Sequence, residues 1–136
     1  MCGYIGHLSF EKVNNARILE SNKLIECRGP DELINLTGEF SKLFNNDDNL
    51  NYSYAFNRLS ILDLSNKASQ PMVSKKFKAI LMFNGEIFNH LELREDLIKN
   101  GVEFSSDHSD TEVVLNGIAY YGIEFIHKMI GQFSIA

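Results

Sequence analysis

The chain has 136 residues, a formal net charge of −5 and 44% hydrophobic residues, which suits one globular domain and argues against disorder. The acidic balance and the lack of a long Lys/Arg run exclude a partner bound mainly through its phosphate backbone, so nucleic-acid binding is not expected. The longest apolar run, residues 79–83, is far shorter than the roughly 20 residues that span a bilayer, and two cysteines make no disulfide framework. We therefore expect a cytoplasmic protein with no membrane partner.

The first half of the chain predicts several strands and one helix. Residues 3–10 suit an opening strand, because apolar side chains stand among glycines that let a neighbouring backbone approach closely. Apolar residues at positions 18, 19, 24 and 25 are compatible with a helix over residues 16–25, and Gly29-Pro30 enforces a turn at residues 28–31. Further strands are expected over residues 33–44, 52–56, 59–62 and 77–83, with a polar loop at residues 45–49.

Two helices with clear ends follow. Residues 90–100 carry a leucine-rich stripe and end before Gly101, which can adopt the left-handed conformation of a C-terminal cap. Ser109 and Glu112 have the spacing of a capping box and predict a helix over residues 109–122. A short helical segment at 125–130 and a strand-like run at 131–136 complete the chain. Strands followed by helices, without an internal repeat, indicate an α+β layered domain.

Cys2 is the residue with the clearest chemical potential. Removal of Met1 would leave a thiol and a free α-amine on one residue, so that the nucleophile carries its own proton acceptor. The unperturbed pKa values, roughly 7.7–8.0 for the amine and 8.5 for the thiol, require little adjustment for the amine to act as a base at neutral pH. On its own, a cysteine is more often a small buried hydrophobic residue.

Five blocks of residues occur in a fixed order. They are Met1-Cys2-Gly3-Tyr4-Ile5-Gly6, Arg28-Gly29-Pro30-Asp31, residues 57–65 with Gln70-Pro71-Met72, residues 83–90, and Ser109-Asp110-Thr111-Glu112. Together they closely resemble the N-terminal glutaminase domain of glutamine-hydrolysing asparagine synthetase, a class II glutamine amidotransferase. The resemblance covers almost the whole chain and implies the N-terminal-nucleophile (Ntn) hydrolase fold, an α/β/β/α sandwich. Because the pattern stops at Ala136, we expect residues 1–136 to be a C-terminally truncated type 2 amidotransferase domain without the synthetase domain.

The resemblance implies a glutaminase reaction with Cys2 as the catalytic nucleophile. Cys2 would attack the carboxamide of glutamine, release ammonia and leave a γ-glutamyl thioester that water hydrolyses. The catalytic oxyanion hole falls on Asn84 and Gly85, through the side-chain amide of the first and the backbone N–H of the second. Interpreted without the resemblance, the Asn-Gly pair is a turn signal.

The family's contacts to glutamine fall on residues that offer a cation, carboxylates and backbone groups. A guanidinium can hold the α-carboxylate of glutamine, and carboxylates can accept from its α-ammonium group. Without the other blocks, Arg58 would be interpreted as a surface ion pair and Asp110 as a helix-capping carboxylate. The implied glutamine-binding residues are Arg58, Leu59, Ser60, Ile61, Leu62, Asn84, Gly85, Glu86 and Asp110, with mostly backbone contacts expected from residues 59–62.

A few positions depart from the family pattern. Cys27 stands before Arg-Gly-Pro-Asp where histidine is usual, and no role is assigned to it. Tyr4, Phe88 and Ser134 replace a common isoleucine, tyrosine and alanine, and we interpret these as packing changes. The four histidines and two cysteines lack metal-ligand spacing, so no metal site is predicted.

The leading hypothesis is hydrolysis of glutamine to glutamate and ammonia, which would feed ATP-dependent synthesis of asparagine from aspartate by a domain beyond residue 136. No cofactor is expected in this segment, since ATP and Mg²⁺ would belong to the missing synthetase domain. The expected partners are glutamine and the synthetase domain of the same longer chain, with a homodimer as one further option. Two alternatives stay open: an asparagine-synthetase-like amidotransferase with another acceptor, and a truncated, non-catalytic remnant that binds glutamine.

Overall fold

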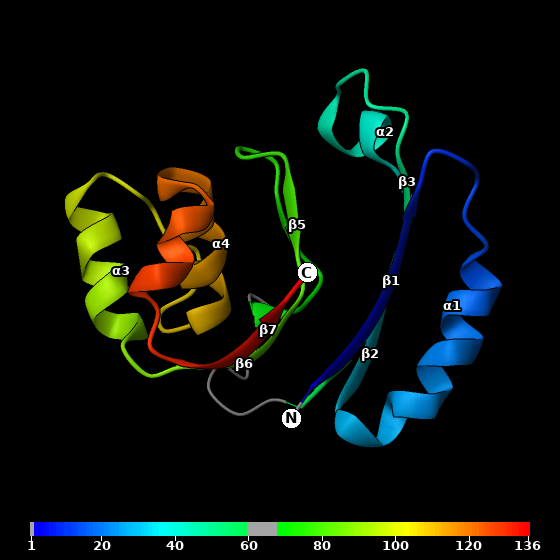
Figure 1. The fold of residues 1–136 in the computed structure, drawn as a ribbon, viewed down its shortest axis with the longest axis horizontal. Helices are drawn as coiled ribbons and strands as arrows, with labels where there is room; N and C mark the ends of the chain where they lie inside the picture. The colour runs from blue at the N-terminus through cyan, green and yellow to red at the C-terminus, as the bar shows by residue number, and fades with distance from the viewer. Residues whose placement is uncertain (1, 60–67) are drawn as a thin grey trace. The chain divides into compact units, whose positions relative to one another are not determined.

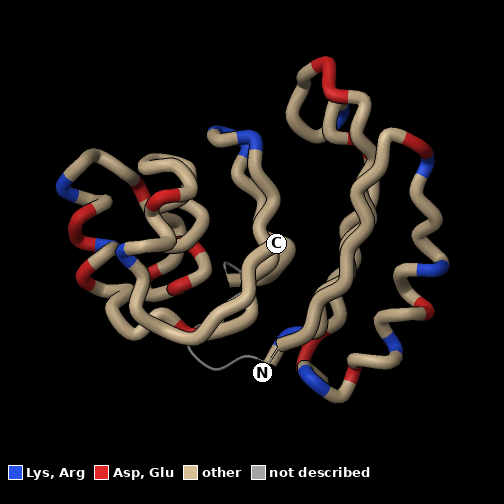
Figure 2. Tube along the Cα trace, in the orientation of Figure 1, with Lys and Arg blue, Asp and Glu red and all other residues tan. Residues whose placement is uncertain are grey.

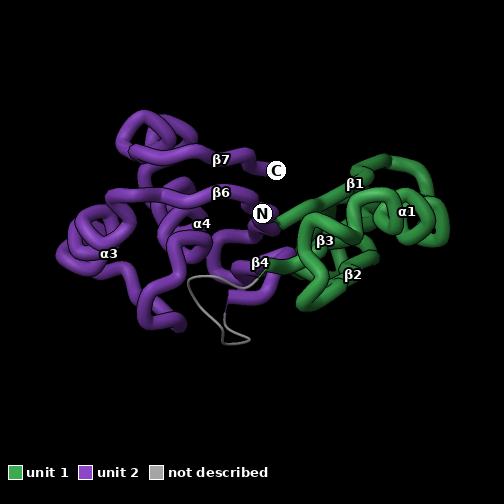
Figure 3. The backbone as a smooth tube through the Cα atoms, turned by 90° about the horizontal axis from the view of Figure 1, so that it is seen from below, with its two compact units in different colours: residues 1–60 green, residues 61–136 purple. Residues whose placement is uncertain are grey.

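The computed structural model describes residues 2–59 and 68–136. The chain divides into two compact units, residues 1–60 and residues 61–136, which Figure 3 draws in green and purple. The strand expected over residues 59–62 lies outside the described residues except for Leu59, which is not in a strand.

The first unit is a three-stranded antiparallel sheet with a helix packed against it (Figure 1). The strand order is β1-β3-β2, so β3 is the middle strand. The elements in chain order are β1 (Gly3–Ser9), α1 (Asn15–Asn22), the 3-10 helix η1 (Lys23–Arg28), β2 (Glu32–Glu39), α2 (Phe40–Phe44) and β3 (Asn51–Arg58). These bounds confirm the strands predicted over residues 3–10 and 52–56, the helix near 16–25 and the turn at 28–31.

The middle strand β3 explains how α1 and the sheet pack. Asn57 is fully buried, and its side-chain amide exchanges two hydrogen bonds with that of Asn22, at 2.9 and 3.0 Å. The Ser53 hydroxyl donates to Oδ1 of Asn15 at 2.7 Å. Because residues two apart on a strand share a face, Ser53 and Asn57 both face α1, whereas Arg58 belongs to the opposite face. Buried amides are expensive unless paired, so these bonds fix α1 on the sheet.

The predicted strand over residues 33–44 is wrong beyond residue 39. Phe40 and Phe44 lie four residues apart on the helix α2, with ring centroids 5.4 Å apart, and Phe40 also meets the ring of Tyr52 edge-on at 5.2 Å. Asn45 then ends the helix in the left-handed conformation, with φ of 52°. The aromatic contacts and this cap favour a helical turn over further extension of β2.

The second unit combines two antiparallel pairs of strands with two longer helices (Figure 1). Strand β4 pairs with β5, and β6 pairs with β7, both antiparallel. The elements are β4 (Met72–Ser74), β5 (Ala79–Leu81), β6 (Phe83–Ile87), α3 (His90–Lys99), α4 (Asp110–Tyr121), the 3-10 helix η3 (Ile123–Lys128) and β7 (Gly131–Ile135). The helices expected at 90–100 and 109–122, the short helical segment near 125–130 and the final strand are confirmed.

The strand predicted over residues 77–83 is only partly correct. Residues 75–78 form the turn between β4 and β5, with Lys78 at a φ of 51°, and Met82 separates β5 from β6. The apolar run therefore contains the end of one pair of strands and the start of the next. A continuous apolar sequence does not reveal such a break, because apolar side chains alone do not mark where one strand ends and the next begins.

The apolar core of the second unit lies between its strands and helices. Gly117 on α4 lets the ring of Phe125 approach so closely that a Cβ atom at this glycine would overlap the ring. The buried members of the core are Met72, Leu81, Phe83, Ile87, Leu93, Leu97, Val102, Val113, Val114, Leu115, Phe125 and Met129.

The ends of α3 and α4 follow the predicted signals with one exception. Gly101 and Gly122 have φ values of 84° and 79°, and Ser109 accepts a hydrogen bond from the Glu112 N–H at 3.3 Å. The reciprocal half of the capping box is absent among the described contacts, because the Glu112 carboxylate instead accepts from the Ser106 N–H at 2.8 Å and from Ser105. Glu112 thus holds the loop before α4 rather than the cap residue.

The observed secondary structure makes the chain an α+β protein, as predicted, with the described strands in three small antiparallel sheets. Figure 2 shows that charged residues of both signs are spread along α1 and α3, while in the first unit β2 and β3 carry charges only at their ends and β1 carries none. Within the described ranges, no helix combines the length and the apolar character needed to cross a membrane.

Candidate active site

The thiol of Cys2 contacts the backbone of Leu59. The Leu59 N–H donates to Sγ at 3.3 Å, and the thiol donates to the Leu59 carbonyl oxygen at 3.6 Å. Cys2 is partly exposed. Cys2, the nucleophile predicted from the sequence, is therefore held by Leu59, the residue after β3. The groups of Leu59 that hold it belong to the backbone, so their position does not depend on the rotamer of the leucine side chain.

The turn at residues 28–31 lies against the same place. Arg28 Nε donates to the carbonyl oxygen of Cys2 at 3.1 Å, and the Asp31 N–H donates to the carbonyl oxygen of Arg58 at 3.1 Å. Between them, Gly29 approaches β3 so closely that a Cβ atom would overlap the backbone of residues 57 and 58. The Arg-Gly-Pro-Asp turn thus contacts the residue before β1 and the end of β3 and connects them. Its sequence alone did not suggest this role.

Arg58 forms an ion pair, as its sequence alone suggested, but the arginine side chain is buried rather than at the surface. Its Nη1 lies 3.4 Å from Oε2 of Glu32, the residue directly opposite it on β2. The side chain of Arg58 is 7% exposed and that of Glu32 is 42% exposed, so this pair is not a surface pair. Its predicted contact with the α-carboxylate of glutamine stays a prediction.

Asn84 and Gly85 lie inside strand β6, so the interpretation of this pair as a turn is wrong. Gly85 is directly opposite Phe133 on β7, and a Cβ atom there would overlap the backbone oxygen of Gln132. Only glycine fits at this close approach. Asn84 is half-buried, and its side-chain amide makes no hydrogen bond in the part of the chain that the structure describes.

The ladder between β6 and β7 decides which backbone groups of β6 are available. Met82 and Ala136 exchange two hydrogen bonds at 2.9 Å, and the Phe88 N–H donates to Ile130 at 2.7 Å. Hydrogen-bonded pairs alternate along an antiparallel ladder, so the even-numbered residues of β6 bond to β7. The N–H of Gly85 therefore points to the other edge, where a ligand can approach.

The two neighbouring N–H groups on that free edge are occupied. The Phe83 N–H donates to Oε1 of Gln70 at 2.5 Å, and the Ile87 N–H donates to Oδ2 of Asp110 at 3.3 Å. Gly85 lies midway between these two residues and has no such partner among the described residues. A backbone donor with this placement can stabilise a developing oxyanion.

Asp110 is the first residue of α4 and is 6% exposed. Burial raises the pKa of its carboxyl above the usual value, and the N–H groups of Ile87 and Thr111 and the charge of His90 oppose this rise. His90 Nδ1 lies 2.9 Å from the carbonyl oxygen of Ile87, to which it donates. Asp110 is thus more than a helix-capping carboxylate, because it joins α4 to the end of β6.

Gln70 and Thr111 are polar residues that sequence reasoning did not assign to the site. Gln70, 6% exposed, donates from Nε2 to the Thr111 hydroxyl at 3.3 Å, and that hydroxyl donates to Oδ1 of Asp110 at 3.5 Å. The Gln70-Pro71 block marks this position in the sequence, but a lone glutamine carries no chemical signal of a network.

The site residues predicted from the sequence separate into two groups. The first unit brings Cys2, Arg58 and Leu59 together at one end of its sheet. The second unit carries the rest of the described set on β6 and at the start of α4: Asn84, Gly85, Glu86 and Asp110. Glu86 is exposed on β6 opposite Gln132. The predicted residues Ser60, Ile61 and Leu62 lie outside the described residues.

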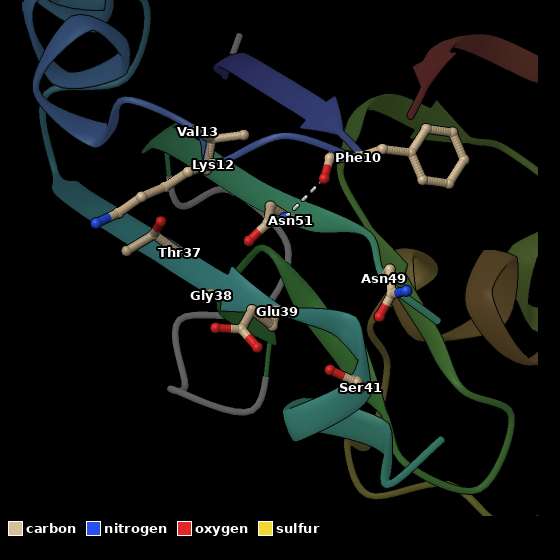
Figure 4. A pocket seen from close by; sticks show the side chains of 9 residues that line it. All are labelled: Phe10, Lys12, Val13, Thr37, Gly38, Glu39, Ser41, Asn49 and Asn51. Carbon is tan, nitrogen blue, oxygen red and sulfur yellow. Dashed lines mark hydrogen bonds between the residues drawn. The ribbon is translucent and has the colours of Figure 1, made fainter. Parts of the chain in front are cut away.

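A pocket of about 650 Å³ lies at the far end of the first sheet (Figure 4). Asn51, which donates to the carbonyl oxygen of Phe10 at 3.5 Å, is part of its wall. Asn51 and Asn57 are six residue steps apart along β3, which corresponds to about 20 Å of extended strand. This pocket is therefore not the surroundings of Cys2, which lie near Asn57 and Leu59.

The described residues contain no group of three or more His, Cys, Asp or Glu side chains placed to hold a metal ion. Cys27, the position that departs from the family's histidine, is exposed as a free thiol at the end of η1.

Comparisons with known proteins find relatives that match nearly the whole chain. A family model described as a glutamine amidotransferase domain matches residues 1–136. Asparagine synthetase (glutamine-hydrolyzing) 1 of Bacillus subtilis (strain 168) is 34% identical over 139 residues, covering 98% of this chain and 20% of that protein. A probable asparagine synthetase (glutamine-hydrolyzing) of Dictyostelium discoideum is 32% identical, with 98% and 22% covered. Asparagine synthetase (glutamine-hydrolyzing) 2 of Bacillus subtilis is 32% identical over 141 residues, with 100% and 17% covered.

The chain spans about a fifth of the length of these relatives, so the similarity concerns one region of each. The family match covers all of residues 1–136, and on this ground the chain belongs to the family of glutamine amidotransferase domains.

Proposed function

We propose that this chain hydrolyses glutamine to glutamate and ammonia, with Cys2 as an N-terminal nucleophile. The single observation that carries the proposal is the position of the Cys2 thiol, held directly before the start of β1 by the backbone of Leu59 and still partly exposed. The relatives are named as glutamine-hydrolysing enzymes, and the region they share with this chain covers 98% of it.

The reaction begins once Met1 is removed. The α-amine of Cys2 accepts the thiol proton, Sγ attacks the carboxamide carbon of glutamine, and a C–S bond forms as the carbonyl π-electrons move to oxygen. The amine then returns the proton to the departing nitrogen, and ammonia leaves as the tetrahedral intermediate collapses to a γ-glutamyl thioester. Water attacks this thioester, glutamate leaves, and the thiol is regenerated.

The resemblance assigns the negative oxygen of that intermediate to Asn84 and Gly85. Two observations support the assignment: the Gly85 N–H points to the free edge of β6, and the Asn84 amide has no partner among the described residues. Donors aimed at the developing charge act only when it appears, so each typically contributes about 10²–10³ in rate.

Recognition of the amino-acid end of glutamine falls to groups of opposite charge. Arg58 would hold the α-carboxylate, and Asp110 with Glu86 would accept from the α-ammonium group. The buried Asp110 carboxylate supports this role, because a cation bound beside it would offset the unfavourable burial of its charge. The backbone of residues 59–62 would complete the contacts.

The proposal extends to the fold and to the larger protein. We assign residues 1–136 to an Ntn α/β/β/α sandwich, which the α+β composition and the family support. The relatives are named as asparagine synthetases, and four fifths of their length lies outside the matched region. The ammonia would therefore feed ATP-dependent synthesis of asparagine from aspartate by a synthetase region beyond residue 136, where ATP and Mg²⁺ would bind.

The test is ammonia release in the presence of glutamine, measured for the wild type and for two cysteine variants. We expect Cys2→Ala to abolish release and Cys27→Ala to retain it, because Cys27 is an exposed free thiol and no hydrogen bond joins it to Cys2 among the described residues. An electrophilic glutamine analogue should label the wild type once, and intact mass should give a mature chain that begins at Cys2. Release that persists in Cys2→Ala, or that is lost equally in both variants, refutes the proposal.

A further inference from the structure

A buried chain of hydrogen bonds connects both ends of β6 to the start of α4. At one end, the Phe83 N–H donates to Gln70 Oε1 at 2.5 Å; at the other, the Ile87 N–H donates to Asp110 Oδ2 at 3.3 Å. Gln70 is linked to Asp110 through the hydroxyl of Thr111, at 3.3 and 3.5 Å. The short segment that carries Asn84 and Gly85 is thus held at its two ends by one connected network.

The donors and acceptors of the network can be arranged in only one order, and this order requires an amide side chain at position 70. The Phe83 N–H requires an acceptor, so Oε1 of Gln70 faces it and Nε2 faces Thr111. The Thr111 hydroxyl accepts this bond and can then donate its own hydrogen to Asp110. A hydrocarbon side chain at position 70 could serve neither neighbour, and a carboxylate could not donate.

Burial makes the arrangement strict. Gln70 is 6% exposed, Thr111 is 5% exposed and Asp110 is 6% exposed, so water replaces none of these bonds at low cost. The network also uses the two N–H groups that flank Gly85 on the free edge of β6, and leaves that of Gly85 open. The same side chains therefore hold the strand and decide which of its donors a ligand meets.

We propose that Gln70 is a positioning residue that, through Thr111, keeps the Asn84–Gly85 segment of β6 and the Asp110 carboxylate in one fixed geometry. The inference rests on the proposed function, because it concerns the residues to which that function assigns the oxyanion hole and the substrate ammonium group. Gln70 itself touches no reacting atom.

The two halves of the network make separable kinetic predictions. Thr111→Val removes the hydroxyl beside Asp110 and leaves the bond from Phe83 to Gln70, so the KM for glutamine should rise about tenfold while kcat stays within about twofold. Gln70→Met removes both bonds and frees the start of β6, so kcat should also fall, by about 10- to 10²-fold. Thr111→Ser, which keeps the hydroxyl, should restore the wild-type KM.

Asn116→Leu is the matched control. Asn116 lies on α4, the helix that carries Thr111, and is 7% exposed. It donates to the carbonyl oxygen of Glu103 at 3.4 Å and has no described bond to β6. This variant should lower the stability without changing kcat or KM. If Gln70→Met and Thr111→Val lose stability but keep the kinetics of Asn116→Leu, the positioning role is refuted and Gln70 is only a structural residue.

Amide hydrogen exchange gives a readout that does not need turnover. The Phe83 N–H bonds to Gln70, whereas the N–H groups of Asn84 and Glu86 bond to β7. Gln70→Met should speed exchange at Phe83 about tenfold or more and leave the other two within about twofold; equal changes at all three refute a local role. Wild-type protein that releases no ammonia refutes the proposed function, and this exchange result distinguishes that failure from a failure of the network.

Discussion

The substitution Gly29→Ala tests whether the turn at residues 28–31 positions the proposed nucleophile. Gly29 has a φ of −153°, outside the left-handed region that favours glycine, so the main effect of the substitution is steric. The new Cβ atom would instead overlap the backbone oxygen of Asn57 and lie 2.5 Å from its carbonyl carbon, where ordinary contact begins at 3.4 Å. The turn or the end of β3 must therefore move by about 1 Å, since both are backbone and cannot rotate away.

A shift of this size has two measurable effects. Overpacking of a tight contact typically costs about 1–3 kcal/mol, which corresponds to a fall of roughly 3–12 °C in Tm for a chain of this size. The displaced turn also carries Arg28, which holds the carbonyl oxygen of Cys2 at 3.1 Å. Because misplacement by about 1 Å costs up to 10²-fold in rate, we expect kcat for ammonia release to fall by about 10- to 10²-fold.

Gly101→Ala is the control for this experiment. A Cβ atom at Gly101 would meet nothing within 4 Å, but its φ of 84° is unfavourable for alanine and costs about 1–2 kcal/mol. Thermal unfolding and steady-state ammonia release are measured for both variants. If Gly29→Ala keeps the wild-type kcat, the idea that the turn at residues 28–31 positions Cys2 is refuted. If Gly29→Ala keeps the wild-type Tm, the steric argument itself is refuted.

Three further predictions concern the second unit. Asn84→Ala should lower kcat by about 10²–10³-fold with little change in the urea midpoint, because its half-buried amide has no described hydrogen bond; a large loss of stability instead would contradict this. Asp110→Asn should raise the KM for glutamine by about 10- to 10²-fold. Because burial raises the pKa of Asp110, the protonated carboxyl stabilises the fold below its unfolded pKa, and this contribution is lost as the pH rises through the folded pKa. In urea unfolding, the stability of Asp110→Asn relative to the wild type should therefore grow toward pH 7. A relative stability that shrinks over this range would contradict the prediction. Glu112→Gln should cost about 1.5–3 kcal/mol, because the carboxylate accepts from Ser105 and Ser106 at 2.7 and 2.8 Å, whereas Glu95→Gln on the exposed face of α3 should cost under about 0.5 kcal/mol.

The elements that sequence reasoning placed correctly have local signals. The helices α3 and α4 have an apolar stripe and a terminal glycine, β1 has apolar residues among glycines, and in β3 the aromatic residues Tyr52, Tyr54 and Phe56 alternate with small ones. The helix α2 was missed because its signal, a pair of phenylalanines four apart before Asn45, also fits an extended strand until the packing against Tyr52 is known. Tertiary contact decided between two periods that five residues cannot distinguish.

The candidate site could be predicted only where residues of suitable chemistry fall on the ordered blocks of the family resemblance. Cys2 and Asp110 were chosen on that resemblance, because on their own they fit a small buried residue and a helix cap, and their roles stay predictions. The contribution of Gln70 could not be, since it depends on a neighbour 41 positions away in the sequence. Glu112 shows the opposite error, because its spacing from Ser109 fits a capping box while its carboxylate binds residues 105 and 106 instead.

The central position of β3 constrains how the length of this chain can vary. A single residue inserted within residues 51–58 would exchange the two faces of the strand, turning Asn57 away from α1 and Arg58 toward it. An insertion among Asp47, Asp48 and Asn49 would instead enlarge an exposed loop and leave that pairing intact. Length polymorphism among natural or engineered versions of the first unit should therefore accumulate at this tip, and chimeras joined there should keep their nucleophile in place.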